Sequence, residues 1–238
     1  AMAALGSGRH VIVDKPAFPD AATATRAAEL AAQKNLVLAE ATVWADHPRL
    51  AAVINAFAAA GSAPTRIVAV FSFPPLPAGN FRHRADQGGG ALFDLGAYAA
   101  SPGRVFFGAE PEHVACRVLS RGEQVETAFV CQMIYPGGKS FSGTFGFDTG
   151  YVTRLDILGP SLATSMDRAF TPPPTATLPL ACNAPTGQTV RDTPPADAFA
   201  HFFRRALTAM AAGHDQPLAE ALLADARTLA RLRESAGG

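Results

Sequence analysis

The sequence predicts an α/β (α+β) fold, in which a short parallel βαβ unit precedes a large, mostly antiparallel open sheet with helices packed on one face. The first observation is a pair of short apolar segments without alternation, at 10–14 and 36–41, separated by a helix-forming segment. Continuous apolar runs of this kind are typical of parallel strands that are covered on both faces. The second observation is a series of longer strand-like segments after residue 65, several of them joined by short turns such as RGEQ and PGGK. Short connections favour antiparallel pairing.

The N-terminal part is expected to alternate helices and strands. Residues 1–7 resemble the last turns of a helix, and the first strand follows. Residues 20–34 are rich in helix formers and begin at Asp20, which is a suitable N-cap. A helix that crosses between the two strands makes them parallel neighbours. Another helix is expected at 47–60, where Pro48 suits the first turn.

The rest of the chain supplies the large sheet. Five strands are expected, at 65–73, 112–120, 126–135, 140–147 and 152–159. A helix at about 91–107 interrupts them, and two helices at about 195–212 and 217–234 close the chain. The last helix carries an apolar stripe at Leu218, Leu222, Ala226, Leu229 and Leu232. Residues 171–195 are rich in Pro and Thr, which predicts an irregular surface excursion.

Composition limits the partners and the compartment. The 20 basic side chains balance the 20 acidic ones, so no electrostatic argument favours nucleic acid or an anionic membrane. We find no signal peptide and no apolar run long enough to span a bilayer. Cys116, Cys131 and Cys182 form no CxxC pair, and buried free thiols are expected for the first two. Together these features lead us to expect a cytoplasmic protein. Since no zinc signature is present, no metal site is expected.

The segment GRHVIVDKP, residues 8–16, indicates one half of an active site. It delivers Asp14 and Lys15 to the carboxyl end of a buried strand, and Pro16 fixes the backbone behind the lysine. The alternative is a solvated surface lysine beside a proline that merely ends the strand.

The segment GGGALFDLGAY, residues 88–98, indicates the other half. Its glycines let the backbone turn tightly and approach a ligand, and the helix that starts there points free N–H groups to the same place. Asp94 and Tyr98 are four apart and share one helical face. Asp94 could instead only interact favourably with the positive end of the helix dipole, and Tyr98 could be a core aromatic residue. The two segments together favour a site more than either does alone.

These segments resemble the Gfo/Idh/MocA family of NAD(P)-dependent oxidoreductases. GRHVIVDKP is similar to the family's G-K-H-V-x-x-E-K-P, with Asp14 where glutamate is usual. WADHP, at 44–48, is similar to its aromatic-x-x-H-P stretch. GGGALFDLGAY is similar to G-G-G-x-x-x-D-x-G-x-H, with Tyr98 where histidine is usual, as in the glucose–fructose oxidoreductase and dihydrodiol dehydrogenase branches.

The resemblance implies two domains. Residues 1–45 would be the C-terminal remnant of a dinucleotide-binding Rossmann domain, and residues 46–238 a substrate-binding and oligomerisation α/β domain. On this resemblance the first strands, the glycine-rich fingerprint and the ribose-binding acidic residue are not among these residues. We therefore expect no tight nucleotide binding by these residues alone.

The resemblance also implies hydride transfer between NAD or NADP and a sugar or another cyclic polyol or alcohol. Lys15 would stabilise a developing alkoxide and lower the pKa of Tyr98, which would donate or accept the proton. Asp94 would bind and orient a substrate hydroxyl. Asp14, Lys15 and Pro16 would form the cofactor side of the site.

The substrate side is expected to include Arg82 and Arg84, which could meet a phosphate or carboxylate of the substrate, together with Asp94, Gly89 and Gly90. A solvated loop is the alternative for the two arginines.

Two non-catalytic functions remain open at this point. A derivative of the family could serve in oligomerisation alone, since the strand at 65–73 would present an apolar face for a homo-oligomer through the open sheet. A sugar-binding module would keep Asp94 and the glycines without requiring Lys15.

Overall fold

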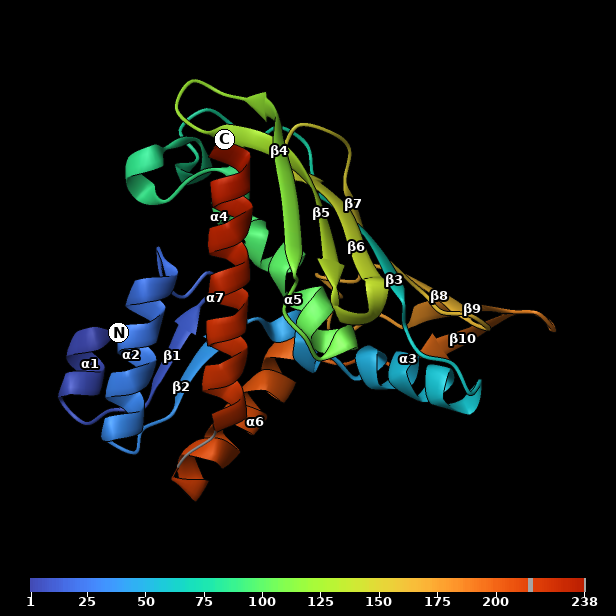
Figure 1. The fold of residues 1–238 in the computed structure, drawn as a ribbon, viewed down its shortest axis with the longest axis horizontal. Helices are drawn as coiled ribbons and strands as arrows, with labels where there is room; N and C mark the ends of the chain where they lie inside the picture. The colour runs from blue at the N-terminus through green and yellow to red at the C-terminus, as the bar shows by residue number, and fades with distance from the viewer. Residues whose placement is uncertain (214–215, 238) are drawn as a thin grey trace.

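A computed structural model of the chain describes residues 1–213 and 216–237. Within these residues the strands form two sheets, one of two strands and one of eight. Figure 1 shows the smaller sheet at the N-terminal, blue end, and the larger sheet on the other side of the red C-terminal helix. The predicted fold class is confirmed.

The N-terminal unit is a parallel βαβ unit, as predicted. It consists of α1 (Met2–Gly6), β1 (Val11–Asp14), α2 (Ala21–Gln33) and β2 (Leu38–Ala41). Val11 pairs with Leu38 in a parallel register that continues along both strands. The side chain of Asp20 accepts a hydrogen bond from the backbone N–H of Thr23, which confirms the predicted N-cap.

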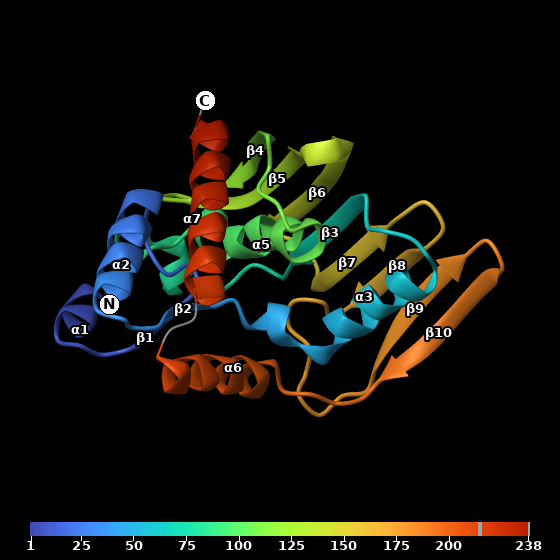
Figure 2. The same cartoon turned by 60° about the horizontal axis from the view of Figure 1, so that its bottom comes forward.

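Both faces of this small sheet are covered, partly by helices from the C-terminal end of the chain. These are α6 (Ala198–Ala212) and α7 (Gln216–Gly237). Leu222 of α7 packs with Leu38 on one face, and Phe202 of α6 packs with Ala39 on the other. Figure 2 shows β1 and β2 between α2 and α7 on one side and α6 on the other. Two helices from the range expected for the second domain therefore complete the core of the first.

The large sheet contains the five predicted strands and three more. Its strands are β3 (Arg66–Ser72), β4 (His113–Arg121), β5 (Glu126–Tyr135), β6 (Lys139–Gly146), β7 (Val152–Leu158), β8 (Ala163–Asp167), β9 (Leu178–Ala184) and β10 (Gly187–Thr193). Their order is β10-β9-β8-β7-β3-β6-β5-β4. Neighbouring strands are antiparallel except for β3 and β6, which run parallel in the middle of the sheet.

The prediction of an irregular excursion over 171–195 is wrong, because most of this segment forms the β9–β10 hairpin. The six residues from Gly187 to Asp192 are all exposed. A strand that pairs its backbone without burying a face leaves no hydrophobic alternation to recognise. Figure 2 shows this hairpin extending from one end of the sheet.

One face of the large sheet is covered by α3 (Pro48–Ala59), α4 (Ala91–Asp94) and α5 (Gly96–Phe107), together with the C-terminal part of α7. The helix predicted at 91–107 is interrupted at Leu95, which leaves Asp94 at the end of α4 and Tyr98 in the first turn of α5.

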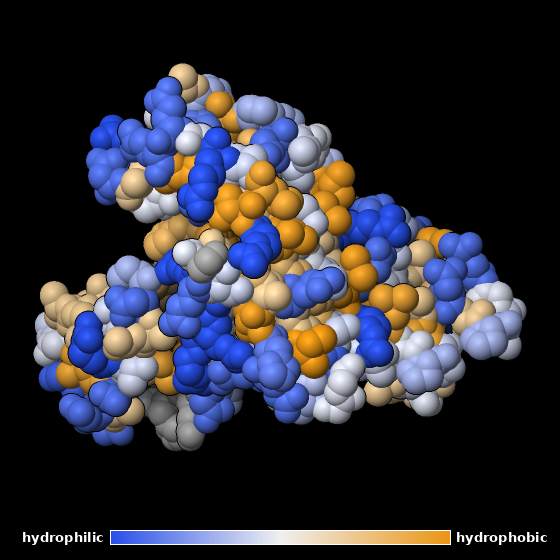
Figure 3. All heavy atoms as spheres, turned by 45° about the horizontal axis from the view of Figure 1, so that its top comes forward, coloured by the Kyte–Doolittle hydropathy of each residue, from blue (hydrophilic) through white to orange (hydrophobic). Residues whose placement is uncertain are grey.

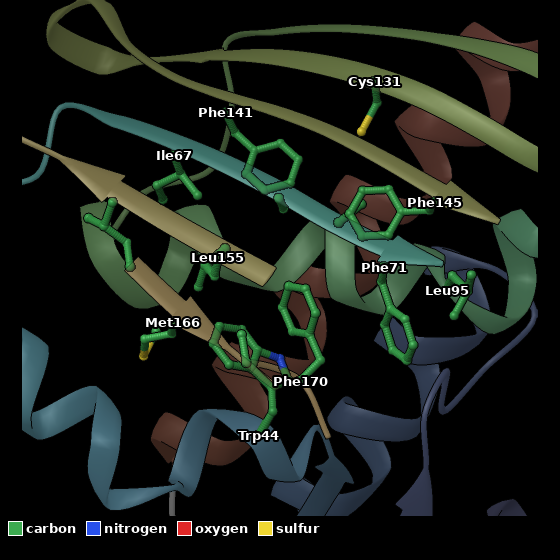
Figure 4. Packing of buried hydrophobic residues seen from close by; sticks show 14 of the residues in the cluster. Trp44, Ile67, Phe71, Leu95, Cys131, Phe141, Phe145, Leu155, Met166 and Phe170 are labelled. Carbon is green, nitrogen blue, oxygen red and sulfur yellow. The ribbon is translucent and has the colours of Figure 1, made fainter. Parts of the chain in front are cut away.

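The core lies between these helices and the sheet. Phe71 of β3 stacks on Phe170 at 5.8 Å between ring centroids, and Trp44 meets Phe170 edge-on at 5.1 Å. Figure 4 shows these aromatic rings gathered beneath the strands. Cys116 and Cys131 are buried free thiols, as predicted.

Candidate active site

Four separate elements bring the predicted polar residues together. Lys15 directly follows β1, Asp94 ends α4, Tyr98 lies in the first turn of α5, and Arg82 lies in η2 (Phe81–His83). Figure 3 shows the surface hollowed on the left, between the part that contains η2 and the part that contains β1 and α2. The site therefore lies where the N-terminal unit meets the large sheet.

Asp94 is the centre of the polar network. The Lys15 ammonium donates to its Oδ1 at 2.9 Å and to its backbone oxygen at 2.5 Å. Arg82 Nε donates to the other carboxylate oxygen, Oδ2, at 2.6 Å. The Asp94 side chain is 11% exposed, and those of Lys15 and Arg82 are 15% and 28% exposed. Residues 79 positions apart thus form a partly buried ion pair.

The charge balance of this network is positive. Burial acts to raise the pKa of Asp94, but the charges and hydrogen bonds of Lys15 and Arg82 outweigh burial and hold that pKa below its ordinary value. Asp94 is therefore ionised. Two cations therefore share the Asp94 carboxylate, while the carboxylate of Asp14 lies close enough to act on Tyr98 as well.

Tyr98 lies against the same network. Its ring packs on Phe71 at 4.9 Å and on Phe170 at 5.2 Å between centroids, and the Lys15 ammonium lies 4.9 Å from the ring centre. Among the residues that the structure describes, no hydrogen bond to the Tyr98 hydroxyl is formed.

The expectation that Lys15 lowers the pKa of Tyr98 is contradicted. Burial, followed by the carboxylates of Asp94 and Asp14, raises the pKa of Tyr98 well above its ordinary value. The reason is geometric, since the ammonium is bonded to Asp94 and faces the aromatic ring. Tyr98 consequently keeps its proton at neutral pH.

The residues around Lys15 have different surroundings. Asp14 is exposed, and its Oδ1 accepts a hydrogen bond from the backbone N–H of Lys15 at 2.8 Å. Pro16 is half-buried and follows Lys15 through a cis peptide bond. Asp14 therefore supports the lysine backbone and lies outside the Asp94 network.

The glycines predicted to approach substrate approach the chain itself. A Cβ on Gly89 would lie 2.6 Å from the Arg82 carbonyl oxygen, and one on Gly90 would lie 2.5 Å from Glu126 Oε1. The same Glu126 oxygen accepts a hydrogen bond from the backbone N–H of Leu92, so a carboxylate of the chain takes one of the free N–H groups of α4.

Arg84 lies apart from the network. Its guanidinium pairs with Asp86 at 2.8 Å, with both side chains about half exposed. Of the two arginines predicted to meet the substrate, only Arg82 is bonded to Asp94.

Glu40 is a buried group that the sequence reasoning missed. It is 8% exposed, and its Oε2 accepts a hydrogen bond from the backbone N–H of Ala17, two residues after Lys15. Its Oε1 accepts a hydrogen bond from Thr42 at 2.7 Å. Burial raises the pKa of Glu40. An acidic residue inside the apolar segment 36–41 was the available signal.

Two negative findings apply to the described residues, 1–213 and 216–237. They contain no cluster of three or more His, Cys, Asp or Glu side chains that could hold a metal ion. None of their helices combines the length and the apolarity needed to cross a membrane.

Comparison with known proteins places the chain in a family. Residues 62–161 match the family described as GFO/IDH/MocA C-terminal domain. The structure is similar to a 3-ketoreductase from Actinomadura kijaniata, crystallised with NADP and TDP-benzene, with a TM-score of 0.90 and 28% identity over 98% of this chain and 73% of that one. The chain belongs to the Gfo/Idh/MocA family.

Two curated relatives within this Gfo/Idh/MocA family are named for a reaction on a particular dTDP-sugar. The dTDP-3,4-didehydro-2,6-dideoxy-alpha-D-glucose 3-reductase of Streptomyces violaceoruber is 33% identical over 90% of this chain and 65% of its own length. The enzyme of the same name from Actinomadura kijaniata is 32% identical over 72% of this chain and 52% of its own length. The chain thus spans about half to two thirds of the length of these two relatives.

Proposed function

We propose that the protein is an NAD(P)-dependent oxidoreductase that transfers a hydride between the nicotinamide and a carbon of a sugar or sugar nucleotide. The observation that carries this proposal is the convergence of Lys15, Asp94 and Tyr98 from three elements. The relatives support a sugar nucleotide as substrate, because their names specify a dTDP-sugar. The similar crystal structure contains NADP, which supports this cofactor over NAD.

The spacing of two residues supports the same proposal. Structures of the Actinomadura 3-ketoreductase include variants in which one lysine or one tyrosine was replaced, and those residues are 84 positions apart in that chain. Lys15 and Tyr98 are 83 positions apart here. The pair that we assign to catalysis thus has the residue types and nearly the spacing of a pair changed in the relative.

The residues present fit a nicotinamide cofactor. Asp14, Lys15 and Pro16 lie at the carboxyl end of β1, and ligands of open α/β sheets bind at the carboxyl ends of the strands. Lys15 and Arg82 supply two cations at this edge that could meet a phosphate-bearing group nearby. When bound, the cofactor supplies or accepts the hydride.

The protein side chains would handle the oxygen and its proton. In the reductive direction the carbonyl oxygen of the substrate gains negative charge. The Lys15 ammonium would stabilise this charge, and its hydrogen bond to Asp94 Oδ1 would hold the ammonium in position. Tyr98 keeps its proton at neutral pH and would donate it to this oxygen. Arg82 orients Asp94, whose carboxylate would accept a hydrogen bond from a neighbouring substrate hydroxyl.

The test is nicotinamide oxidation by the native protein with a keto-sugar nucleotide as substrate. We expect Lys15→Ala and Tyr98→Phe each to lower kcat/KM by about 10²-fold or more. Lys34→Ala, a change of an exposed lysine at the end of α2, serves as control. A wild-type protein without activity, or variants as active as the wild type, would refute the proposal.

The uncovered face of the large sheet supports a second part of the proposal, a homo-oligomer. Val68, Ile134 and Val152 are each at least 40% exposed, while Ile67 and Phe71 of the other face are buried. The strand register places these three exposed residues on the same face of the sheet, and exposed apolar residues gathered on one face are typical of interfaces. We expect the molar mass from light scattering to fall to that of the monomer in Val68→Lys, and an unchanged mass would contradict this assignment.

The division at residue 45 and a cytoplasmic location are also proposals. The buried free thiols Cys116, Cys131 and Cys182 favour a reducing compartment.

A further inference from the structure

Tyr151 is an exposed aromatic residue close to the candidate active site. It precedes β7 and is 43% exposed. Its hydroxyl forms a 2.7 Å hydrogen bond with Thr171 Oγ1, which fixes the direction of the ring. Tyr151 is also among the groups whose proximity raises the pKa of Tyr98. The Thr171 partner directly follows Phe170, whose ring packs on the Tyr98 ring at 5.2 Å between centroids, so Tyr151 lies close to the candidate site.

Arg168 lies over the ring of Tyr151. Its guanidinium carbon is 4.5 Å from the ring centroid, and the residue is exposed. The arginines Arg82, Arg84 and Arg154 each pair with a carboxylate, whereas no ion pair of Arg168 is found within residues 1–213 and 216–237. A stacked guanidinium keeps its N–H groups free for an anion.

The backbone around Arg168 is held in an unusual conformation. Arg168 has a φ of 54°, in the left-handed region that residues other than glycine seldom adopt. The next two residues are fixed on β7: the N–H of Ala169 donates to the Thr153 carbonyl at 3.1 Å, and the N–H of Phe170 donates to Thr153 Oγ1 at 3.2 Å. Strained residues held by their surroundings are frequent at ligand sites.

One short segment therefore contributes to two parts of the site. Phe170 packs against the ring of Tyr98, where we place the reacting oxygen. Arg168, two residues before Phe170, places its guanidinium over the ring of Tyr151. A planar guanidinium binds phosphate oxygens with two parallel hydrogen bonds, and its stacking on an aromatic ring limits the entropy lost on binding.

We propose that Arg168, held by Tyr151, binds the diphosphate of a nucleoside-diphosphate sugar whose sugar ring reaches Tyr98. The position of the sugar rests on the proposed function. The binding of the diphosphate does not, because it requires only Arg168 and Tyr151.

The experiment is titration calorimetry of the full chain with dTDP, with thymidine as the ligand that lacks phosphate. We expect saturable binding of dTDP and much weaker binding of thymidine. Arg168→Gln should weaken dTDP binding about tenfold or more, and Arg168→Lys should recover only part of it, because a lysine lacks the planar fork. Tyr151→Leu, which removes the stacking ring, should weaken binding by a smaller factor.

Arg154→Gln is the matched control. Arg154 is an exposed arginine of β7 that pairs with Asp156, and it lies on the opposite side of the strand from the buried Thr153. It should bind dTDP as the wild type does. Absence of dTDP binding, equal binding of thymidine, or an equal loss in Arg154→Gln and Arg168→Gln would each overturn the inference.

The failure of this inference can be told apart from failure of the proposed function. Lys15→Ala and Tyr98→Phe should lower the kcat/KM of hydride transfer by about 10²-fold or more and leave dTDP binding within about twofold. If the wild type shows no hydride transfer but binds dTDP in a way that depends on Arg168, the proposed function is refuted and the diphosphate site is supported. If the wild type shows hydride transfer but Arg168→Gln binds dTDP as tightly as the wild type does, the proposed function is supported and the diphosphate site is refuted.

Discussion

Asp94 and Asp225 each form an ion pair with an arginine at the same shortest distance, but the pKa values of the two carboxyl groups are shifted in opposite directions. Arg82 Nε lies 2.6 Å from Asp94, and Arg104 Nη2 lies 2.6 Å from Asp225. The pKa of Asp94 is lowered, whereas burial raises that of Asp225 in spite of the hydrogen bonds from Arg104.

The difference comes from the number of cations and from burial. Asp94 has Lys15 as a second cation and opens onto the candidate site, while Asp225 is 5% exposed and meets one arginine. Its neighbourhood also contains the buried carboxyl of Glu40. The Asp225 pair thus joins α7 to α5, and the Asp94 pair keeps charge available for chemistry.

The largest effect is expected from Asp225→Ala. The change leaves Arg104, only 25% exposed, without its carboxylate, and should lower the free energy of unfolding by about 3–5 kcal/mol. Thermal unfolding followed by circular dichroism measures the loss. Asp86→Ala, which breaks the exposed pair with Arg84, is the control and should leave Tm unchanged. Similar losses in both variants would remove the distinction between the two kinds of pair.

Asp94→Ala should cost less, about 1–3 kcal/mol, because Lys15 and Arg82 remain partly hydrated. The pKa of Asp94 is lower in the folded than in the unfolded state. Its contribution is therefore fully present above the ordinary carboxyl pKa and is lost as the pH falls through the folded value. Unfolding measured from pH 7 to pH 2 should show the wild type and Asp94→Ala converging at the acidic end. Parallel curves would contradict the lowered pKa.

Arg82→Gln tests the second cation directly. With Lys15 as the remaining cation, the pKa of Asp94 should rise toward its ordinary value, and stability should fall by about 1 kcal/mol. The carboxyl carbon of Asp94, followed by NMR during an acid titration, reports this pKa. An unchanged pKa would assign the whole shift to Lys15.

Glu40→Gln should have the smallest effect and the opposite sign. Glutamine can accept from the Ala17 N–H and donate to Thr42, so the contacts are kept. Because the pKa of Glu40 is raised on folding, ionisation of the wild type costs stability as the pH rises above the ordinary carboxyl value. The variant should therefore gain up to about 1 kcal/mol relative to the wild type between pH 4 and pH 8 in urea titrations. A relative loss over that range would show that ionised Glu40 stabilises the fold.

Local patterns predicted the parts of the fold that bury one face. The apolar stripe of α7 is confirmed at Leu218, Leu222, Leu229 and Leu232, all of which are buried. The exposed β10 has no such stripe, and its pairing with β9 depends on backbone hydrogen bonds that side chains do not reveal.

The contacts among Lys15, Asp94 and Tyr98 could be predicted from the sequence, whereas their electrostatics could not. Lys15, Asp94 and Tyr98 were identified from two short segments, yet the direction of the Tyr98 pKa depends on where the Lys15 ammonium is bonded. The Arg168–Tyr151 contact was hidden for a similar reason, because a left-handed arginine in a loop has no sequence pattern of its own.

The helix α7 has a mechanical consequence for the site. It packs on α2 and β2 of the N-terminal unit and on α5 and β4 of the other part, and stands between them in Figure 1. Arg233 donates to the Pro19 carbonyl at 2.6 Å on one side, and Arg231 donates to the Glu112 carbonyl at 2.7 Å on the other. A hinge between the two sheets would have to break one of these sets of contacts. The helix α7 thus bridges the two parts, and a change in the separation between β1, which carries Lys15, and α4, which carries Asp94, would require its contacts to rearrange.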